Sequence, residues 1–131
     1  MKQIFKEGDS KKLRVEVDDK DVASFNGNVV HRVCSTFALA KNIEWATRQY
    51  VLEMTEPDEE GIGTSITINH KSPALIGEIL EIYSTIESLK GNKLICRYEV
   101  RTKERLIAEG TTGQKILKKE KIEKIFSSLP G

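Results

Sequence analysis

Apolar and polar positions repeat with different periods along the chain, and each change of period predicts a new element. Residues 12–17 alternate apolar and charged side chains, which is typical of a half-buried strand. Residues 18–32 contain three aspartates, an Asn-Gly-Asn run and little periodicity, which predicts a loop. From residue 36 to residue 54 the spacing becomes helical, so a helix follows that loop.

The predicted helix carries apolar side chains on more than one side. Two apolar sets recur at helical spacing, namely Phe37, Ala40, Val51 and Met54, and Leu39, Ile43, Ala46 and Tyr50. Polar residues leave only a narrow strip, so we expect the helix to be covered on several sides. The Glu56-Pro57-Asp58 segment should end it, because a proline and the residue before it disfavour helix.

The rest of the chain predicts strands joined by short turns. A period-two segment would place one set of residues on a single face: Ile62, Thr64, Ile66, Ile68 and His70. Further strands are predicted over residues 76–89, 93–101 and 106–116, with turns at 90–93 and 102–105. Apolar residues at i, i+3, i+4 and i+7 predict a short C-terminal amphipathic helix: Ile122, Ile125, Phe126 and Leu129.

These elements predict one domain over residues 1–131 with an α+β fold. Strands joined by tight turns must be antiparallel, since parallel crossovers need a dozen or more residues. An antiparallel sheet that curves around one long apolar helix buries both elements.

Composition then removes several classes of protein. The chain has 131 residues, with 21 Lys+Arg against 20 Asp+Glu. The resulting net charge of +1 argues against a nucleic-acid partner, because binding to phosphates requires a basic surplus. No apolar run is long enough to span a membrane or to serve as a signal peptide, so we expect a cytoplasmic protein. Two cysteines and two histidines are too few for the common metal sites, so no metal is expected.

His70 is the most informative candidate for chemistry. It continues the Ile66 and Ile68 face, so it should point toward the helix rather than toward water. One interpretation is a core histidine whose ring nitrogens are satisfied by a backbone carbonyl. The other is a general base facing a site on the helix.

Glu44 and Thr36 form a row with Ala40 along the predicted helix, because eight residues span a little over two turns. Glu44 could instead form a salt bridge with Arg48 or Lys41, and Ser35 or Thr36 could be the helix cap. If hydroxyl, carboxylate and imidazole converge, they could activate a water or hydroxyl against a carbonyl carbon.

The Gly61-Ile62-Gly63-Thr64 segment opens the strand that carries His70. A glycine there would let a ligand approach the backbone, whose N–H groups can stabilise an oxyanion. The simpler interpretation is a turn at the entry of the strand.

With these residues in view, the sequence resembles the hotdog-fold thioesterases, in particular the fluoroacetyl-CoA thioesterase-like branch. The segments that carry the resemblance are 33–39, 43–45, 61–64, 68–70 and 109–112. The spacing of Thr36, Glu44 and His70 is similar to the family's threonine–glutamate–histidine triad, and Gly63 to its strand glycine.

The resemblance implies a hotdog fold: a curved antiparallel sheet wrapped around a long central helix, with a short C-terminal helix. It also implies a homodimer with two sites at the subunit interface, an acyl-CoA substrate and no cofactor beyond the CoA of that substrate. Thr36 would be the nucleophile or position a water, His70 would be the base and then the acid, and Glu44 would orient the imidazole. The predicted substrate-binding residues are Gly63, Thr64, Phe37 and Lys71.

The chain departs from the family at the lid. The founding enzyme has lid phenylalanines where this sequence has Gly27 and Val30, so fluoroacetyl-CoA is not the predicted substrate. We expect hydrolysis of a small or medium acyl-CoA. A non-catalytic acyl-CoA- or metabolite-binding module, or an enoyl-thioester hydratase, would be compatible with the same fold. Lys115, Lys118 and Lys119 could contact CoA phosphates or simply form a solvated helix start.

Overall fold

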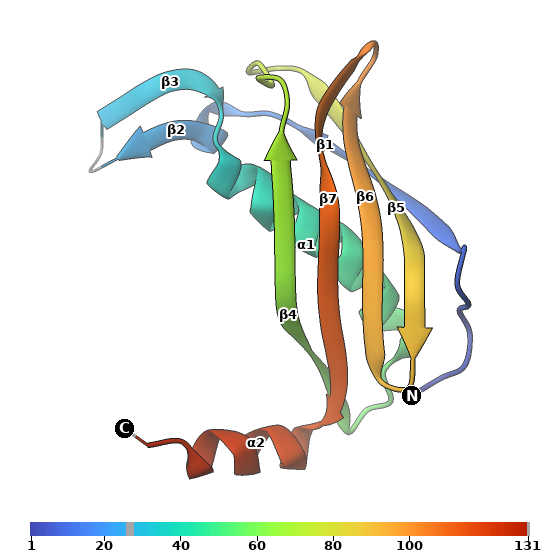
Figure 1. Ribbon diagram of the computed structural model, residues 1–131. Helices are drawn as coiled ribbons and strands as arrows, with labels where there is room; N and C mark the ends of the chain where they lie inside the picture. The colour runs from blue at the N-terminus through green and yellow to red at the C-terminus, as the bar shows by residue number, and fades with distance from the viewer. Residues whose placement is uncertain (26–27, 131) are drawn as a thin grey trace.

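A computed structural model describes residues 1–25 and 28–130, and it places one five-stranded antiparallel sheet across one long helix (Figure 1). The sheet order is β1-β5-β6-β7-β4, formed by β1 (Ser10–Glu16), β5 (Ile79–Lys90), β6 (Lys93–Thr102), β7 (Arg105–Lys118) and β4 (Glu59–His70). The helices are α1 (Thr36–Met54) and α2 (Lys119–Ser128). The predicted α+β architecture of a curved sheet on a long helix is confirmed.

The predicted loop over 18–32 is wrong for most of its length. It contains a short 3-10 helix, η1 (Asp19–Asp21), and a two-stranded sheet of β2 (Val22–Phe25) and β3 (Asn28–Cys34). Register shifts interrupt the β2–β3 pairing on both sides of Ala23, so the sequence shows no regular alternation there. Residues 26 and 27, part of the same prediction, lie outside the described residues.

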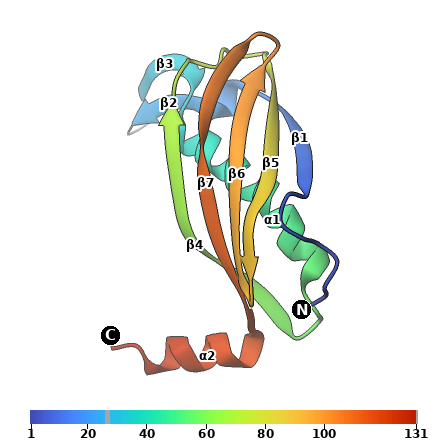
Figure 2. The same ribbon diagram turned by 45° about the vertical axis from the view of Figure 1, so that its right-hand side comes forward.

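Helix α1 has the predicted bounds but is covered on one side only. Six of its apolar side chains are buried against the sheet: Leu39, Ile43, Ala46, Tyr50, Val51 and Met54. Phe37 and Trp45, in contrast, are 82% and 50% exposed. Figure 2 shows the reason, since the sheet lies along one flank of α1 and leaves the other flank open. The expected covering on several sides therefore does not occur within one chain.

Side chains alternate between the two faces of each strand, and those on the helix side form the core. In β6 the residues at every second position are buried, and they are Leu94, Cys96, Tyr98 and Val100. Strand β5 starts at Ile79, later than predicted, because Gly77 adopts a positive φ of 90° just before it. The edge strands of this sheet are β1 and β4, and β4 carries the candidate site.

The C-terminal helix α2 forms as predicted and extends away from the sheet below β4 (Figures 1 and 2). Only Ile122 of its apolar face is buried, and Phe126 and Leu129 are exposed. Within the described ranges, neither helix combines the length and the apolar character needed to cross a membrane.

Candidate active site

Ser35 and Thr36 take separate roles at the start of α1. The Ser35 hydroxyl caps the helix by accepting a hydrogen bond from the Ala38 N–H at 3.0 Å. Thr36 is therefore free for another partner, and its Oγ1 lies 3.0 Å from His70 Nδ1. These two residues are 34 positions apart, so the fold and not the local chain makes this contact. The distance suits transfer of the hydroxyl proton to the imidazole.

His70 is the last residue of β4 and pairs with the buried Ala108 of β7, so both lie on the helix side of the sheet. This agrees with the predicted direction of the side chain. His70 is nevertheless exposed, because it ends an edge strand. Its observed partner is the Thr36 hydroxyl instead of the backbone carbonyl expected for a core histidine.

A β-bulge at Thr64 changes which residues of β4 face the helix. Gly63 pairs with Gln114 and Ser65 with Gly113, so Thr64 has no partner in the ladder. Before the bulge, Gly61 and Gly63 face α1; after it, the helix-facing residues are Ile66, Ile68 and His70. The prediction that Ile62 and Thr64 share the His70 face is therefore wrong. Through the bulge, Gly63 and His70 share a face although an odd number of residues separates them.

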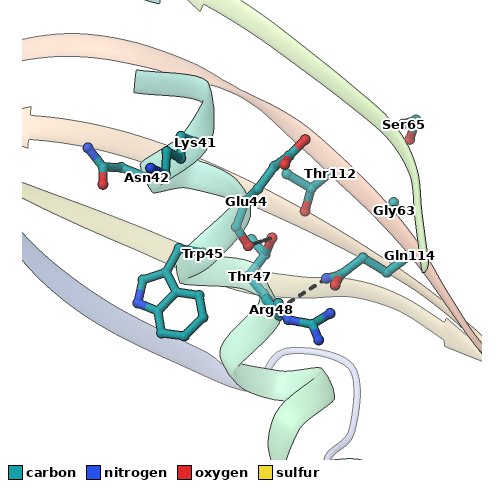
Figure 3. A pocket seen from close by; sticks show the side chains of 11 residues that line it. Lys41, Asn42, Glu44, Trp45, Thr47, Arg48, Gly63, Ser65, Thr112 and Gln114 are labelled. Atoms are coloured by element: carbon teal, nitrogen blue, oxygen red, sulfur yellow. Dashed lines mark hydrogen bonds between the residues drawn. The ribbon is translucent and has the colours of Figure 1, made fainter. Parts of the chain in front are cut away.

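Glu44 lies two turns after Thr36 and lines a pocket of about 400 Å³ between α1 and strands β4 and β7 (Figure 3). Neither predicted salt bridge forms, since Arg48 pairs with Glu60 at 3.0 Å. Hydrogen bonding to Arg48 is the main cause that lowers the pKa of the Glu60 carboxyl. In the described part of the chain, no hydrogen bond or ion pair joins Glu44 to Thr36 or His70. The structure thus brings Thr36 and His70 together but leaves Glu44 apart.

Three buried polar side chains lie in the wall of this pocket, whose surface is otherwise mostly apolar. Thr47, Thr112 and Gln114 are 1%, 2% and 7% exposed, and all three line it beside Glu44. Gln114 Nε2 donates a hydrogen bond to the Thr47 carbonyl oxygen at 3.1 Å, which ties β7 to α1 (Figure 3). Gly63 lines the same pocket, and a Cβ at that position would meet no atom within 4 Å. Open space beside the Gly63 backbone fits the predicted close approach of a ligand.

Sequence reasoning did not identify Thr47, Thr112 or Gln114. Thr112 ends the 109–112 segment of the resemblance, which assigned it no role, Gln114 belongs to no motif, and Thr47 lies within an apolar helix. A usable signal existed on β7, where Thr112 and Gln114 share a period-two face with the apolar Ala108 and Ile116. Polar residues on a core-facing row indicate a site or an internal hydrogen bond.

A second cavity, of about 770 Å³, lies at the start of α1 and includes Thr36 and Phe37. Lys41 and Asn42 line both cavities, so the two are neighbours along one flank of the helix. Two lysines and two aspartates line the larger cavity, so their charges balance: Lys20, Lys41, Asp18 and Asp21. Together the two cavities have room for a long substrate.

Two of the predicted substrate-binding residues line neither of the two cavities. Thr64 is exposed at the bulge, and Lys71 is exposed with its Nζ 3.9 Å from Glu109 Oε1. Lys118 of the basic group pairs with Asp58 at 2.9 Å. Of the lid positions, Gly27 lies outside the described residues.

The two cysteines are free thiols and both are buried. Burial raises the pKa of Cys96 to about 12 and, together with nearby Asp21, that of Cys34 to about 11. Both therefore remain protonated at neutral pH and offer no thiolate nucleophile.

Comparison with known proteins agrees with this architecture. A family model described as fluoroacetyl-CoA-specific thioesterase matches residues 17–120. A solved Thermus thermophilus protein, described as a thioesterase superfamily member, is 31% identical over 95% of this chain and 93% of its own, with a TM-score of 0.88. A search of curated protein sequences finds no match.

More distant structures share the fold. The fluoroacetyl-CoA thioesterase FlK is 20% identical, with a TM-score of 0.84 over 96% of this chain and 98% of its own. A hot-dog-like protein from Thermanaerovibrio acidaminovorans is 15% identical, with a TM-score of 0.86 over 97% of this chain and 95% of its own. The expected hotdog fold is thus confirmed.

Proposed function

Since this chain belongs to the fluoroacetyl-CoA-specific thioesterase family of hotdog proteins, we propose that it hydrolyses a small or medium acyl-CoA to the free acid and CoA. The observation that carries the proposal is the 3.0 Å contact between Thr36 Oγ1 and His70 Nδ1, in which Thr36 also lines the larger cavity. A mutant of FlK has been solved in complex with fluoroacetate and CoA, which supports a CoA ester as the class of substrate.

The Thr36–His70 pair can perform both halves of the reaction. Thr36 Oγ1 attacks the thioester carbonyl carbon as its proton passes to His70 Nδ1. The carbon–sulfur bond breaks and the imidazolium returns the proton to the CoA thiolate, leaving an acyl ester on Thr36. A water then attacks that ester, with His70 taking its proton and giving one back to Thr36.

Glu44 and Gly63 lie too far away to serve that same Thr36–His70 pair within one chain. Six ladder steps of extended strand separate Gly63 from His70, about 20 Å, and Glu44 lies eight positions after Thr36 on the helix, about 12 Å. Each chain therefore carries two half-sites, one at the C-terminal end of β4 and one near its middle. The first is Thr36 with His70, and the second is Glu44 with Gly63.

A second copy would unite the half-sites. Strand β4 is an edge of the sheet, with unpaired backbone groups along its outer side. Antiparallel pairing of β4 with β4 of a partner, centred on Thr67, would place Gly63 of the partner subunit opposite His70, because the bulge at Thr64 takes up one residue. The Gly63 N–H of the partner subunit would then meet the developing oxyanion, and Glu44 of the partner subunit would orient the imidazole.

Substrate binding follows from the two cavities. The acyl group would occupy the pocket beside Glu44 and Gly63 of the partner subunit, and the CoA arm would occupy the larger cavity beside Phe37 of the subunit that supplies Thr36. Lys20 and Lys41, which line that cavity, and the exposed Lys71 would contact the CoA phosphates. Thr64, at the bulge, would border the acyl entrance.

The activity is tested by thiol release from a panel of acyl-CoA esters. Wild type should turn over at least one ester, and His70→Ala should lose at least about a hundredfold in kcat/KM, the usual contribution of a general base. Thr36→Ala should abolish any acyl-enzyme seen by mass spectrometry. Tight acyl-CoA binding in calorimetry without turnover would refute the proposal and support a non-catalytic binding module.

The composite site is tested by mixing two inactive variants. Glu44→Gln and His70→Ala, dissociated and reassembled at equal concentration, should recover about a quarter of wild-type activity, since half of the dimers are mixed and each has one intact site. A His70→Ala and Thr36→Ala mixture is the matched control and should recover none, because both groups come from the same chain. No recovery in the first mixture would refute the shared site.

A further inference from the structure

We propose that a second copy of this chain covers the apolar face of α2, so that the C-terminal helix of each subunit packs against the partner at the end that carries the partner's Thr36–His70 pair. This inference rests on the shared site proposed above, because it uses the same pairing along β4. It adds to that pairing a contact made by an element that the catalytic proposal does not use.

Helix α2 leaves most of its apolar face uncovered within one chain. Its apolar residues follow one another at i, i+3, i+4 and i+7, so they share one face: Ile122, Ile125, Phe126 and Leu129. Ile122 is only 9% exposed, whereas Phe126 and Leu129 are 62% and 61% exposed. Single apolar side chains are common on protein surfaces, but a row of them on one helix face indicates a contact surface.

The start of α2 is held in place by the sheet. Lys118, the last residue of β7, pairs with Glu59 of β4 and forms an ion pair with Asp58 at 2.9 Å. The backbone N–H of Lys119 donates a hydrogen bond to the Asp58 carbonyl oxygen at 2.8 Å. The direction of the helix is therefore set by the fold. Figures 1 and 2 both show α2 running from β7 past β4, away from β5 and β6.

The length of α2 carries its exposed end beyond the sheet of its own subunit. Ten helical residues span about 15 Å, and neighbouring strands lie about 4.8 Å apart. The helix therefore extends about two strand spacings past β4, which is an edge of the sheet. Ile122 is buried at the start of α2, where the helix contacts β7, and the same face continues to Phe126 and Leu129 one and two turns further along.

The pairing along β4 supplies the occupant of this face. Centred on Thr67, it sets the partner's His70 opposite Gly63, so the partner's chain beyond that histidine lies beside the first residues of β4. Helix α2 starts just past Glu59, at the same end of β4. Its apolar end therefore meets the partner where the partner's chain leaves its own β4. Because the pairing is two-fold, both helices make this contact and the buried apolar area doubles.

The test measures the dissociation constant of the dimer by sedimentation velocity without substrate. Phe126→Ser should raise this constant by about tenfold or more, since the apolar contact is lost from both helices at once. Phe126→Leu keeps an apolar side chain and should change the constant by less than about threefold. Glu123→Ser is the matched control, because it places the same residue on the exposed polar face of the same helix, and it should leave the constant unchanged.

Thiol release gives a second readout, because the shared site needs two subunits. Phe126→Ser should lose activity on dilution at concentrations where wild type stays fully active, and should regain it as the concentration rises. An unchanged dimer constant in Phe126→Ser, a change from tetramer to active dimer, or a wild type that is monomeric at every concentration would overturn the α2 contact. Absence of acyl-CoA hydrolysis by a wild-type dimer would overturn the thioesterase proposal alone, since the dimer constants are measured independently of turnover.

Discussion

Gly110 is the position in β7 at which adding one methyl group should cost most. It pairs with Ile68 of β4 and Tyr98 of β6. A Cβ there would collide with the Thr67 carbonyl oxygen and lie 2.8 Å from the Thr67 carbonyl carbon and 2.9 Å from the Tyr98 hydroxyl. Two of these atoms belong to the backbone, so no side-chain rotation can relieve the contact.

The expected loss follows from two contributions. Overpacking in a well-packed region costs about 1–3 kcal/mol. The Tyr98 hydroxyl donates to the Thr67 carbonyl at 2.8 Å, and losing that bond from a side chain only 1% exposed costs a further ~1–3 kcal/mol. Gly110→Ala should therefore lower the free energy of unfolding by about 2–6 kcal/mol, a large part of the total stability of a domain.

Urea denaturation at a fixed protein concentration measures this directly. With a slope of about 2 kcal/mol/M, the midpoint for Gly110→Ala should fall by about 1–3 M. Tyr98→Phe removes only the hydrogen bond and should lose less. In the double variant the two losses should not add, because both changes act on the same hydroxyl. A Gly110→Ala midpoint within about 0.3 M of wild type would refute the steric argument.

Three further predictions follow from caps, burial and charge. Ser35→Ala should cost about 1 kcal/mol of stability in urea, since it removes the cap of α1. Cys34 and Cys96 should resist alkylation at pH 8 in the folded protein and react fully in denaturant, because burial raises their pKa values to about 11 and about 12; fast labelling of folded protein would contradict this. The pKa of Glu60 is lower in the folded than in the unfolded protein, so its ionised carboxylate stabilises the fold at any pH above the unfolded pKa, and this stability is lost as the pH falls through the folded pKa. Arg48→Gln should therefore destabilise the protein at pH 7 and much less at pH 3 in urea melts. An equal loss of stability at both pH values would exclude the ion pair as the cause.

The sequence predicts the elements whose spacing is regular. Helix α1 has the predicted bounds because its apolar positions recur without interruption between the Ser35 cap and Pro57. Strands β5, β6 and β7 follow from alternation and from two tight turns. The β2–β3 hairpin escapes prediction because its register shifts break the period on which strand prediction depends.

The candidate site also has a part that the sequence predicts and a part that it does not. Spacing and the family resemblance predict that Thr36 and His70 lie together, and the two side chains are in contact. The sequence does not show that Gly63 faces the helix, because the bulge at Thr64 shifts the alternation. A fixed period of two therefore places the residues before Thr64 on the wrong face of β4. Thr112 and Gln114 become candidate site residues only once the pocket that they line is known, and this pocket is enclosed by α1, β4 and β7.

The bulge at Thr64 also limits how the length of β4 can change. Deleting Thr64 would give a regular ladder and keep Gly63 and His70 on the helix side, because Gly63 and Ser65 already pair with the adjacent residues Gln114 and Gly113. Inserting or deleting one residue between Ser65 and His70 would instead turn either Gly63 or His70 to the outer face, because side chains alternate along a strand. Single changes of length should therefore be tolerated at Thr64 and not between Ser65 and His70, so that parity along this part of β4, as well as residue identity, determines whether a variant keeps both half-sites on the helix side.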